Sequence, residues 1–373
     1  MTRSKKALLG FYALSFALLF LVLEGVSMLA ISFLSRNGIF FDKAIIQQNY
    51  REYLRVRDPV LGWGPLAKAV DLFGARRDLS TYSNSRPCLD VYGDSFTWGD
   101  EVADKDAWAT LLSDLLKCRV RNFGVGGYGS DQAYLRFLNA KDHSPVVFLD
   151  HWSDNILRNV NQFRNFLVPG PQYGFKPRFV LRDAELSRLS LPSVPESALQ
   201  AFFDNPGLVL THEFFLPNSP SGPLIPTFPY SWSLVKGYGN WMIRAKLRGR
   251  PIYADFYSPD HPSHALAVTS AILTDFYSKA TAQGIRAVVV FFPGCRDFDE
   301  KRKLGEFPYE PLVRTLREAH VRSLDMGELI AEKYGADFQR LYVTCRGHLN
   351  PQGNRLVAEI ISQYTQREKL IDN

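Results

Sequence analysis

A serine and a histidine, far apart in the chain, stand in the settings that nucleophilic catalysis requires. Ser95 comes directly after Gly93 and Asp94, at the end of the apolar stretch Leu89–Tyr92. Such a stretch predicts a buried strand, and ligand sites of open α/β sheets form at the carboxyl ends of strands. A serine is a weak nucleophile unless a base removes its proton and donors hold the oxyanion. His348, near the end of the chain, is the candidate base.

Alternating strands and helices are expected to position these two residues. Apolar stretches predict five strands, at 89–92, 119–123, 146–150, 287–292 and 321–324. Helices are predicted at 107–117, 130–139, 264–283, 310–319 and 352–364. Strands that alternate with helical crossovers favour a parallel sheet with helices on both faces.

Four short blocks, in this order, resemble those of the SGNH (GDSL-type) hydrolase superfamily. They occupy residues 93–95, 122–127, 152–155 and 348–354, each at the end of a predicted strand or in a loop. The resemblance spans roughly residues 88–160 and 264–365. It implies a flavodoxin-like three-layer sandwich with a five-stranded parallel sheet, here with an N-terminal transmembrane helix and an inserted cap region.

The resemblance also implies a role for each block. Ser95 would be the nucleophile and, through its backbone N–H, one oxyanion donor, with Gly127 as the second. The side-chain amide of Asn155 would be the third donor, although a strict alignment puts Asp154 in that place. His348 would be the general base. No metal or organic cofactor is expected for this chemistry.

One feature departs from the family pattern. The family usually has an aspartate two or three residues before the histidine, where it orients the imidazole and stabilises its charged form. This chain has Cys345 and Arg346 there, and neither can replace a carboxylate. Three explanations remain open: a Ser–His dyad suffices, an acid such as Asp297 or Asp299 substitutes, or hydrolysis has been lost.

The first 36 residues predict a membrane anchor. Arg3, Lys5 and Lys6 precede a stretch from Ala7 to Leu34 that is long and apolar enough to cross a bilayer. The positive flank favours an N-in orientation in the inner (cytoplasmic) membrane, with the remaining chain in the periplasm or extracellular space. A cleaved signal peptide is the competing interpretation. Glu24 inside the stretch would be protonated, meet a partner helix, or lie near the outer interface.

Four cysteines fit an oxidising compartment. Cys88 and Cys118 each come just before a predicted strand, Cys295 follows the fourth strand, and Cys345 follows a short apolar run. These positions predict the pairs Cys88–Cys118 and Cys295–Cys345. The second pair would attach the histidine loop to the end of the fourth strand.

The expected organisation has four parts: an anchor (1–36), a lead-in segment packed on the catalytic domain (37–85), the hydrolase domain (86–160 and 263–368), and a cap insertion (161–262). The insertion is rich in Pro, Gly and aromatic residues, and the segment from Phe175 to Arg178 in it suggests a basic lip for an acidic glycan or a membrane-facing patch. Among the 373 residues, 46% are hydrophobic and 22% charged, which is typical of a globular chain. The net charge of +6 comes with no basic stripe, so nucleic acid is not an expected partner.

The resulting hypothesis is a serine esterase or O-acyltransferase that acts outside the cytoplasm on acyl esters, above all acetyl esters, of carbohydrate. The expected partners are the membrane, such a substrate, and a membrane protein that binds the anchor. The alternative is an SGNH scaffold without catalysis, kept for glycan binding or for assembling a membrane complex.

Overall fold

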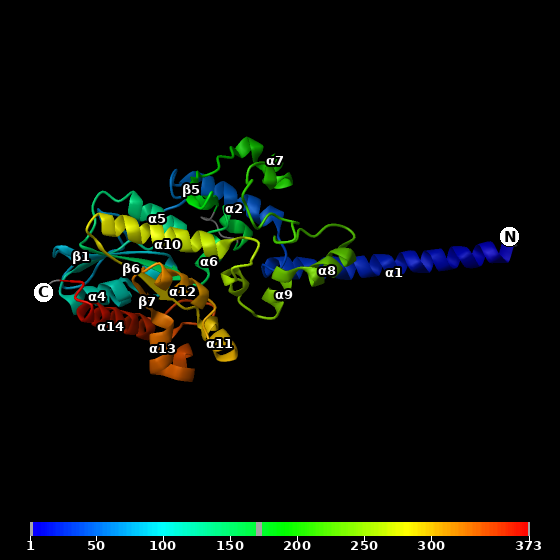
Figure 1. The fold of residues 1–373 in the computed structure, drawn as a ribbon. Coiled ribbons are helices and arrows are strands. Elements are labelled where there is room, and N and C mark those ends of the chain that lie inside the picture. Colours follow the sequence, from blue (N-terminus) through cyan, green and yellow to red (C-terminus); the bar gives the residue numbers. More distant parts are fainter. Residues whose placement is uncertain (1–2, 169–173, 372–373) are drawn as a thin grey trace.

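A parallel five-stranded sheet forms the centre of the molecule, which is described here from a computed structural model (Figure 1). The structure describes residues 3–168 and 174–371. The strand order is β2-β1-β3-β6-β7, and every neighbouring pair is parallel. The strands are β1 (Pro87–Tyr92), β2 (Arg119–Asn122), β3 (Val146–Trp152), β6 (Arg286–Phe292) and β7 (Ser323–Asp325). This is the flavodoxin-like order 2-1-3-4-5, so the predicted fold class is confirmed.

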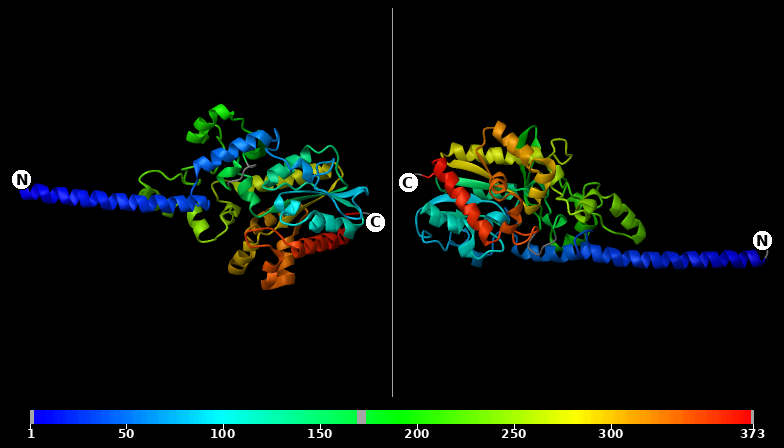
Figure 2. Two further views of the ribbon diagram at one scale, coloured as in Figure 1. Left: turned by 180° about the vertical axis from the view of Figure 1, so that it is seen from behind. Right: turned by 90° about the horizontal axis from the view of Figure 1, so that it is seen from below.

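Helices cover both faces of this sheet, as the alternating pattern predicted (Figures 1 and 2). One face carries α5 (Ser130–Leu138), α10 (Ala265–Ala282) and α12 (Glu310–Glu318). The other carries α4 (Trp108–Leu116), α13 (Met326–Tyr334) and α14 (Pro351–Arg367). Because both faces are covered, a central strand such as β6 can be an unbroken apolar run, with six of its seven residues buried.

Short helices at the ends of strands were harder to foresee from the sequence. They are α3 (Ser95–Trp98) after β1, α6 (Asn155–Arg158) after β3, and α11 (Cys295–Leu304) after β6. The single turns α3 and α6 lack the length over which an apolar period can be recognised, and α11, with ten residues, is mostly charged. All three begin just beyond the carboxyl end of a strand, which is the edge where the site forms.

Residues 37–85 contact both the sheet domain, where the Trp63 indole donates to the carbonyl oxygen of Gly126 at 3.0 Å, and residues 161–262. Their main element, α2 (Lys43–Val56), starts at Asp42, whose side chain accepts from the N–H groups of Ala44 and Ile45. Tyr50 and Tyr53 of α2 are fully buried among aromatic rings of residues 163–203.

Residues 161–262 contain a β-hairpin and three helices, while residues 169–173 lie outside the described part. The elements are β4 (Arg178–Arg182), β5 (Glu185–Leu189), α7 (Leu199–Asp204), α8 (Tyr230–Gly239) and α9 (Trp241–Leu247). The expected basic lip is wrong, because Lys176 is fully buried and pairs with Asp131 of α5. Arg178 is also buried and donates to the carbonyl oxygen of Val160 at 3.0 Å. Buried cations must be paired, so these residues attach the segment to the sheet domain.

Helix α1 (Arg3–Arg36) extends away from the domain, at the end of the molecule opposite to the C-terminus (Figures 1 and 2). By length and composition, Ala7–Arg36 is the one described helix that could cross a membrane. Most of its apolar side chains are exposed. Length and composition alone also fit a signal sequence.

Candidate active site

Ser95 lies at the carboxyl end of β1, as the sequence predicted. It is the first residue of α3, and the Asp94 carboxylate caps this helix by accepting from the N–H of Phe96 at 2.7 Å. Strand β1 is flanked by β2 and β3, whose connections leave in opposite directions, so the sheet has its switch point here. The serine therefore occupies the part of the sheet where α/β proteins bind ligands.

Gly127 lies in the loop that follows β2. The N–H of Tyr128 donates to the carbonyl oxygen of Val125 at 3.2 Å, which closes a tight turn, and Gly127 has a φ of 80° in it. A residue with a side chain is strained at this φ, so the turn requires glycine. Within the described residues, the N–H groups of Gly127 and Ser95 donate to no other protein atom. Both are free to act as oxyanion donors.

Asn155 and Asp154, the two candidates for the third oxyanion donor, differ in the contacts that their side chains make. Asp154 forms an ion pair with Arg158, with Oδ2 and Nε 3.0 Å apart. Asn155 is fully buried, and its amide faces the Asp94 carboxylate without a hydrogen bond of ordinary geometry to any described residue. A buried amide without a well-formed hydrogen bond is costly unless a ligand completes it. The structure therefore favours Asn155 over Asp154 as the candidate side-chain donor.

Glu101 provides the carboxylate that the sequence seemed to lack. Its Oε1 lies 3.3 Å from Nδ1 of His348, and its Oε2 accepts from the backbone N–H of His348 at 3.2 Å. The contact to Nδ1 is within ion-pair distance but lacks hydrogen-bond geometry, and catalytic contacts are often loose before substrate binds. With Nδ1 facing an acid, Nε2 is the ring nitrogen left for the serine.

The local backbone is arranged around this contact. Glu101 has a φ of 71°, a left-handed conformation that non-glycine residues rarely adopt outside special sites. Gly347 leaves the space that the carboxylate needs, because a Cβ there would come within 2.7 Å of Glu101 Oε2. The unusual φ of Glu101 and the missing side chain of Gly347 together allow the Glu101 carboxylate to approach His348.

Further acids surround the histidine. Burial raises the pKa of Asp94, and the charges of Arg158 and His348 oppose that shift. Burial likewise raises the pKa of Asp100, and the charge of His348 again opposes it. Phe96 packs against the imidazole with ring centroids 5.0 Å apart. Asp94, Asp100 and Glu101 are thus the acidic neighbours of His348, while Arg346 is exposed.

Asp297 and Asp299, the acids named from the sequence, are engaged elsewhere. Asp297 is fully buried, accepts from the Ser153 and Tyr253 hydroxyls and from the N–H of Gly294, and burial raises its pKa to about 6. Asp299 forms an ion pair with Arg302. The structure brings neither to His348, because β6 ends in a helix whose first turn uses Asp297 as part of its N-terminal cap.

Both predicted disulfides are present. Cys88–Cys118 joins the starts of β1 and β2, at the edge of the sheet away from the site, with Cα atoms 6.0 Å apart. Cys295–Cys345 joins the first residue of α11 to the loop of His348, with Cα atoms 5.0 Å apart. The second disulfide, together with the N–H of Val343 bonded to the carbonyl oxygen of His348 at 2.9 Å, holds the histidine loop in place.

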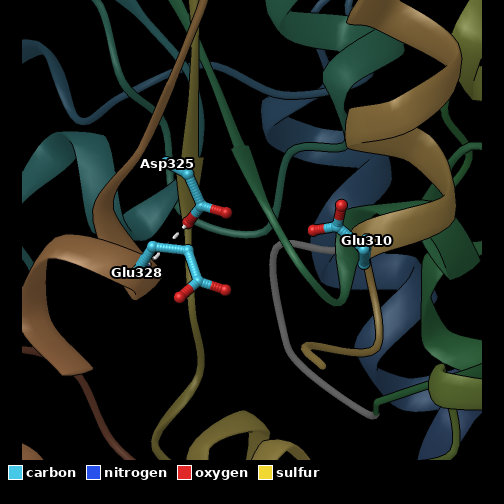
Figure 3. Close-up of side chains that lie close together, drawn as sticks. All are labelled: Glu310, Asp325 and Glu328. Carbon is cyan, nitrogen blue, oxygen red and sulfur yellow. Dashed lines mark hydrogen bonds between the residues drawn. The ribbon is translucent and has the colours of Figure 1, made fainter. Parts of the chain in front are cut away.

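Three carboxylates gather near the end of β7, those of Glu310, Asp325 and Glu328 (Figure 3). Asp325 is used as a helix cap, because it accepts from the N–H groups of Gly327 and Glu328 at 2.8 and 3.2 Å. Glu328 is paired with Lys301. Helix capping and ion pairing thus account for Asp325 and Glu328, two of the three members.

The strand order and the four blocks together define a protein with the SGNH hydrolase fold. No family model matches the chain, and no curated protein matches it. Similar solved structures include a lipolytic protein of the G-D-S-L family from Veillonella parvula (12% identity, 76% of this chain and 100% of that one, TM-score 0.35). A second is a psychrotrophic esterase from Pseudoalteromonas (10% identity, 76% of this chain and 97% of that one, TM-score 0.36). A third is an acetyl xylan esterase from Butyrivibrio proteoclasticus (11% identity, 78% of this chain and 65% of that one, TM-score 0.30).

Proposed function

We propose that this chain is a membrane-anchored serine esterase or O-acyltransferase that acts outside the cytoplasm on acyl esters of carbohydrate, acetyl esters first among them. The observation that carries the proposal is the Glu101 carboxylate at 3.3 Å from Nδ1 of His348. It supplies the acid whose apparent absence favoured a scaffold without catalysis. The set Ser95, His348 and Glu101 then has the composition that acyl transfer requires.

The proposed reaction has two halves. Ser95 Oγ attacks the acyl carbonyl while Nε2 of His348 takes the hydroxyl proton, and the N–H groups of Ser95 and Gly127 with the Asn155 amide stabilise the oxyanion. Collapse of the tetrahedral intermediate passes the proton to the leaving alcohol and leaves an acyl-serine. Water then releases a free acid, or a sugar hydroxyl takes the acyl group, and Ser95 regains its proton. Glu101 holds the imidazole and balances its charge throughout.

Location and substrate are supported by separate features. The apolar helix α1, the positive residues before it and the two disulfides support a single-pass, N-in anchor in the inner membrane. Beside the site, Trp152 stacks on Phe96 with ring centroids 4.9 Å apart and is only partly buried. The Arg158 guanidinium lies over the same ring at 4.7 Å, so the exposed part of Trp152, rather than an open face, is what a sugar could contact. Trp108, by contrast, belongs to the core and is fully buried.

The test uses the full chain in detergent. Hydrolysis of p-nitrophenyl acetate and transfer of acetyl groups to oligosaccharides are measured for wild type, Ser95→Ala and His348→Ala, with Ser278→Ala on the exposed side of α10 as the control. Both site variants should lose activity while the control keeps it. Activity that survives Ser95→Ala would sink the mechanism. A folded wild type inactive in every assay would favour the scaffold.

A further inference from the structure

In the segment from Phe228 to Leu247, α8 packs against α1, while Trp241 and Met242 of α9 join the main core. A small apolar cluster joins the segment to α1, built from Ile31, Phe40 and Ile243 with partly buried neighbours on both sides. Phe20 of α1 also meets Phe228, with ring centroids 6.2 Å apart. In both figures α8 lies at the α1 end of the molecule, far from the C-terminus.

Glu24 makes the most specific contact between the two segments. Its carboxylate accepts from the N–H groups of Tyr230 and Ser231, the latter at 3.2 Å, and from the Ser231 hydroxyl. These are the first residues of α8, whose N–H groups have no partner within the helix. A carboxylate at this end also meets the positive pole of the helix. An acid in an apolar helix thus serves as the N-terminal cap of α8.

The position of this contact relates α8 to the bilayer. A hydrocarbon core of about 30 Å is spanned by about 20 helical residues. Counted from Ala7, the residue that follows the positive flank, the span ends near Val26. Glu24 therefore lies close to the outer edge of the hydrocarbon, and the start of α8 is held at the same depth.

The outward side of α8 is apolar and aromatic. Exposed side chains there and just before it are Phe228 (64%), Trp232 (55%), Val235 (57%) and Tyr238 (79%). Trp and Tyr are the residues that prefer the membrane–water interface. Residues 214–254 contain no Asp or Glu but five Lys or Arg, at 236, 244, 246, 248 and 250. Apolar and aromatic side chains combined with basic ones are typical of helices that lie in the headgroup region.

We infer that α8 is a second membrane contact, with Phe228, Trp232, Val235 and Tyr238 inserted in the outer-leaflet interface and Glu24 fixing their depth. The occupant of this surface is lipid, because the surface continues that of a helix proposed to span the bilayer. The inference rests on the proposed anchor. It implies that the site works at a fixed orientation to the membrane, since α1 and α8 hold the domain at two points.

The experiment uses the full chain in vesicles of zwitterionic and anionic phospholipid. All four native cysteines are in disulfides, so an added cysteine is the one free thiol for a nitroxide label. Labels at Trp232→Cys, Val235→Cys and Tyr238→Cys are compared with Leu19→Cys in α1 and Leu208→Cys, an equally exposed apolar site in the insertion. Accessibility to oxygen and to a water-soluble nickel complex reports the surroundings of each label.

The three α8 labels should resemble Leu19→Cys, with access to oxygen exceeding access to nickel, and Leu208→Cys should show the reverse. Adding Glu24→Ala should shift the α8 labels towards nickel access and leave Leu19→Cys unchanged. Nickel access at all three α8 sites, with Leu19→Cys in lipid, would overturn the inference and leave the anchor standing. Protection of those sites in native membranes alone would assign the surface to a protein partner, which also overturns it. Nickel access at Leu19→Cys would instead refute the anchor.

Discussion

The carboxylate near the His348 imidazole is that of Glu101, because Cys345 and Arg346, just before the histidine, carry none. The carboxylate comes from the loop after the nucleophile helix, so serine and acid are only six positions apart while the base is 247 residues from the acid. Ser95 and Glu101 both follow the carboxyl end of β1. The histidine loop then has to be held in place independently.

Replacing Glu101 by Gln should lower kcat for ester hydrolysis by roughly 10²- to 10⁴-fold, because the imidazole loses both its orienting partner and the charge that stabilises its protonated form. KM should change little. The matched control is Asp299→Asn, which removes a partly exposed acid that the sequence analysis named as a candidate. Equal losses in both variants, or none in Glu101→Gln, would refute the assignment of the acid.

Asn155 and Asp154 can be separated in the same assay. Asn155→Ala should reduce kcat by roughly 10²- to 10³-fold, the usual cost of one oxyanion donor. Asp154→Asn should weaken only the pair with Arg158 and leave kcat within a few-fold of wild type. The opposite order of effects would put Asp154 in the donor position.

The Glu101 contact could not be derived from the sequence, although two signals were present in it. An acid stood in the loop of the nucleophile block, and a glycine preceded the histidine. Neither signal has meaning until the fold brings the loops together, because Gly347 matters only through the space that it leaves for Glu101. The positions of Ser95, Gly127 and Asn155 in the fold were easier to predict, since each follows a strand whose end is visible in the pattern.

At the scale of elements, apolar runs located all five strands of the parallel sheet to within a few residues. Short helices such as α3 and α11 were not predicted, and the internal order of residues 161–262 was not predicted either. Those residues owe their structure to long-range contacts, such as the buried pair of Lys176 with Asp131, that have no local signature.

The two disulfides should differ in their effect on catalysis. Replacing both Cys295 and Cys345 by Ser should lower the free energy of unfolding by about 4 kcal/mol for a loop of 50 residues, and lower kcat by roughly 10- to 100-fold as the histidine loop moves. Replacing Cys88 and Cys118 should lower the free energy of unfolding slightly less and leave kcat unchanged. This disulfide joins the amino ends of β1 and β2, while Ser95 follows the carboxyl end of β1. Denaturant unfolding and initial rates in detergent measure both effects; an equal loss of kcat in the two double variants would contradict the proposed role.

For the whole molecule, the proposed topology places Lys5 and the sheet domain on opposite sides of the membrane. A thiol at Leu208→Cys should react with a membrane-impermeant maleimide in intact spheroplasts, while Lys5→Cys should react only after permeabilisation. The purified chain should keep its full mass, as an uncleaved anchor requires. A shortened chain would support the signal-peptide interpretation, and reaction at Lys5→Cys without permeabilisation would reverse the orientation.

The central claim is that Ser95 is activated by His348 and Glu101, and covalent labelling tests it without knowledge of the substrate. The full chain is incubated with a fluorophosphonate, and the rate and site of modification are followed by mass spectrometry. Wild type should be modified at Ser95, with His348→Ala and Glu101→Gln reacting at least about 100-fold more slowly. Modification of wild type no faster than of His348→Ala, or at a serine other than Ser95, would contradict the account.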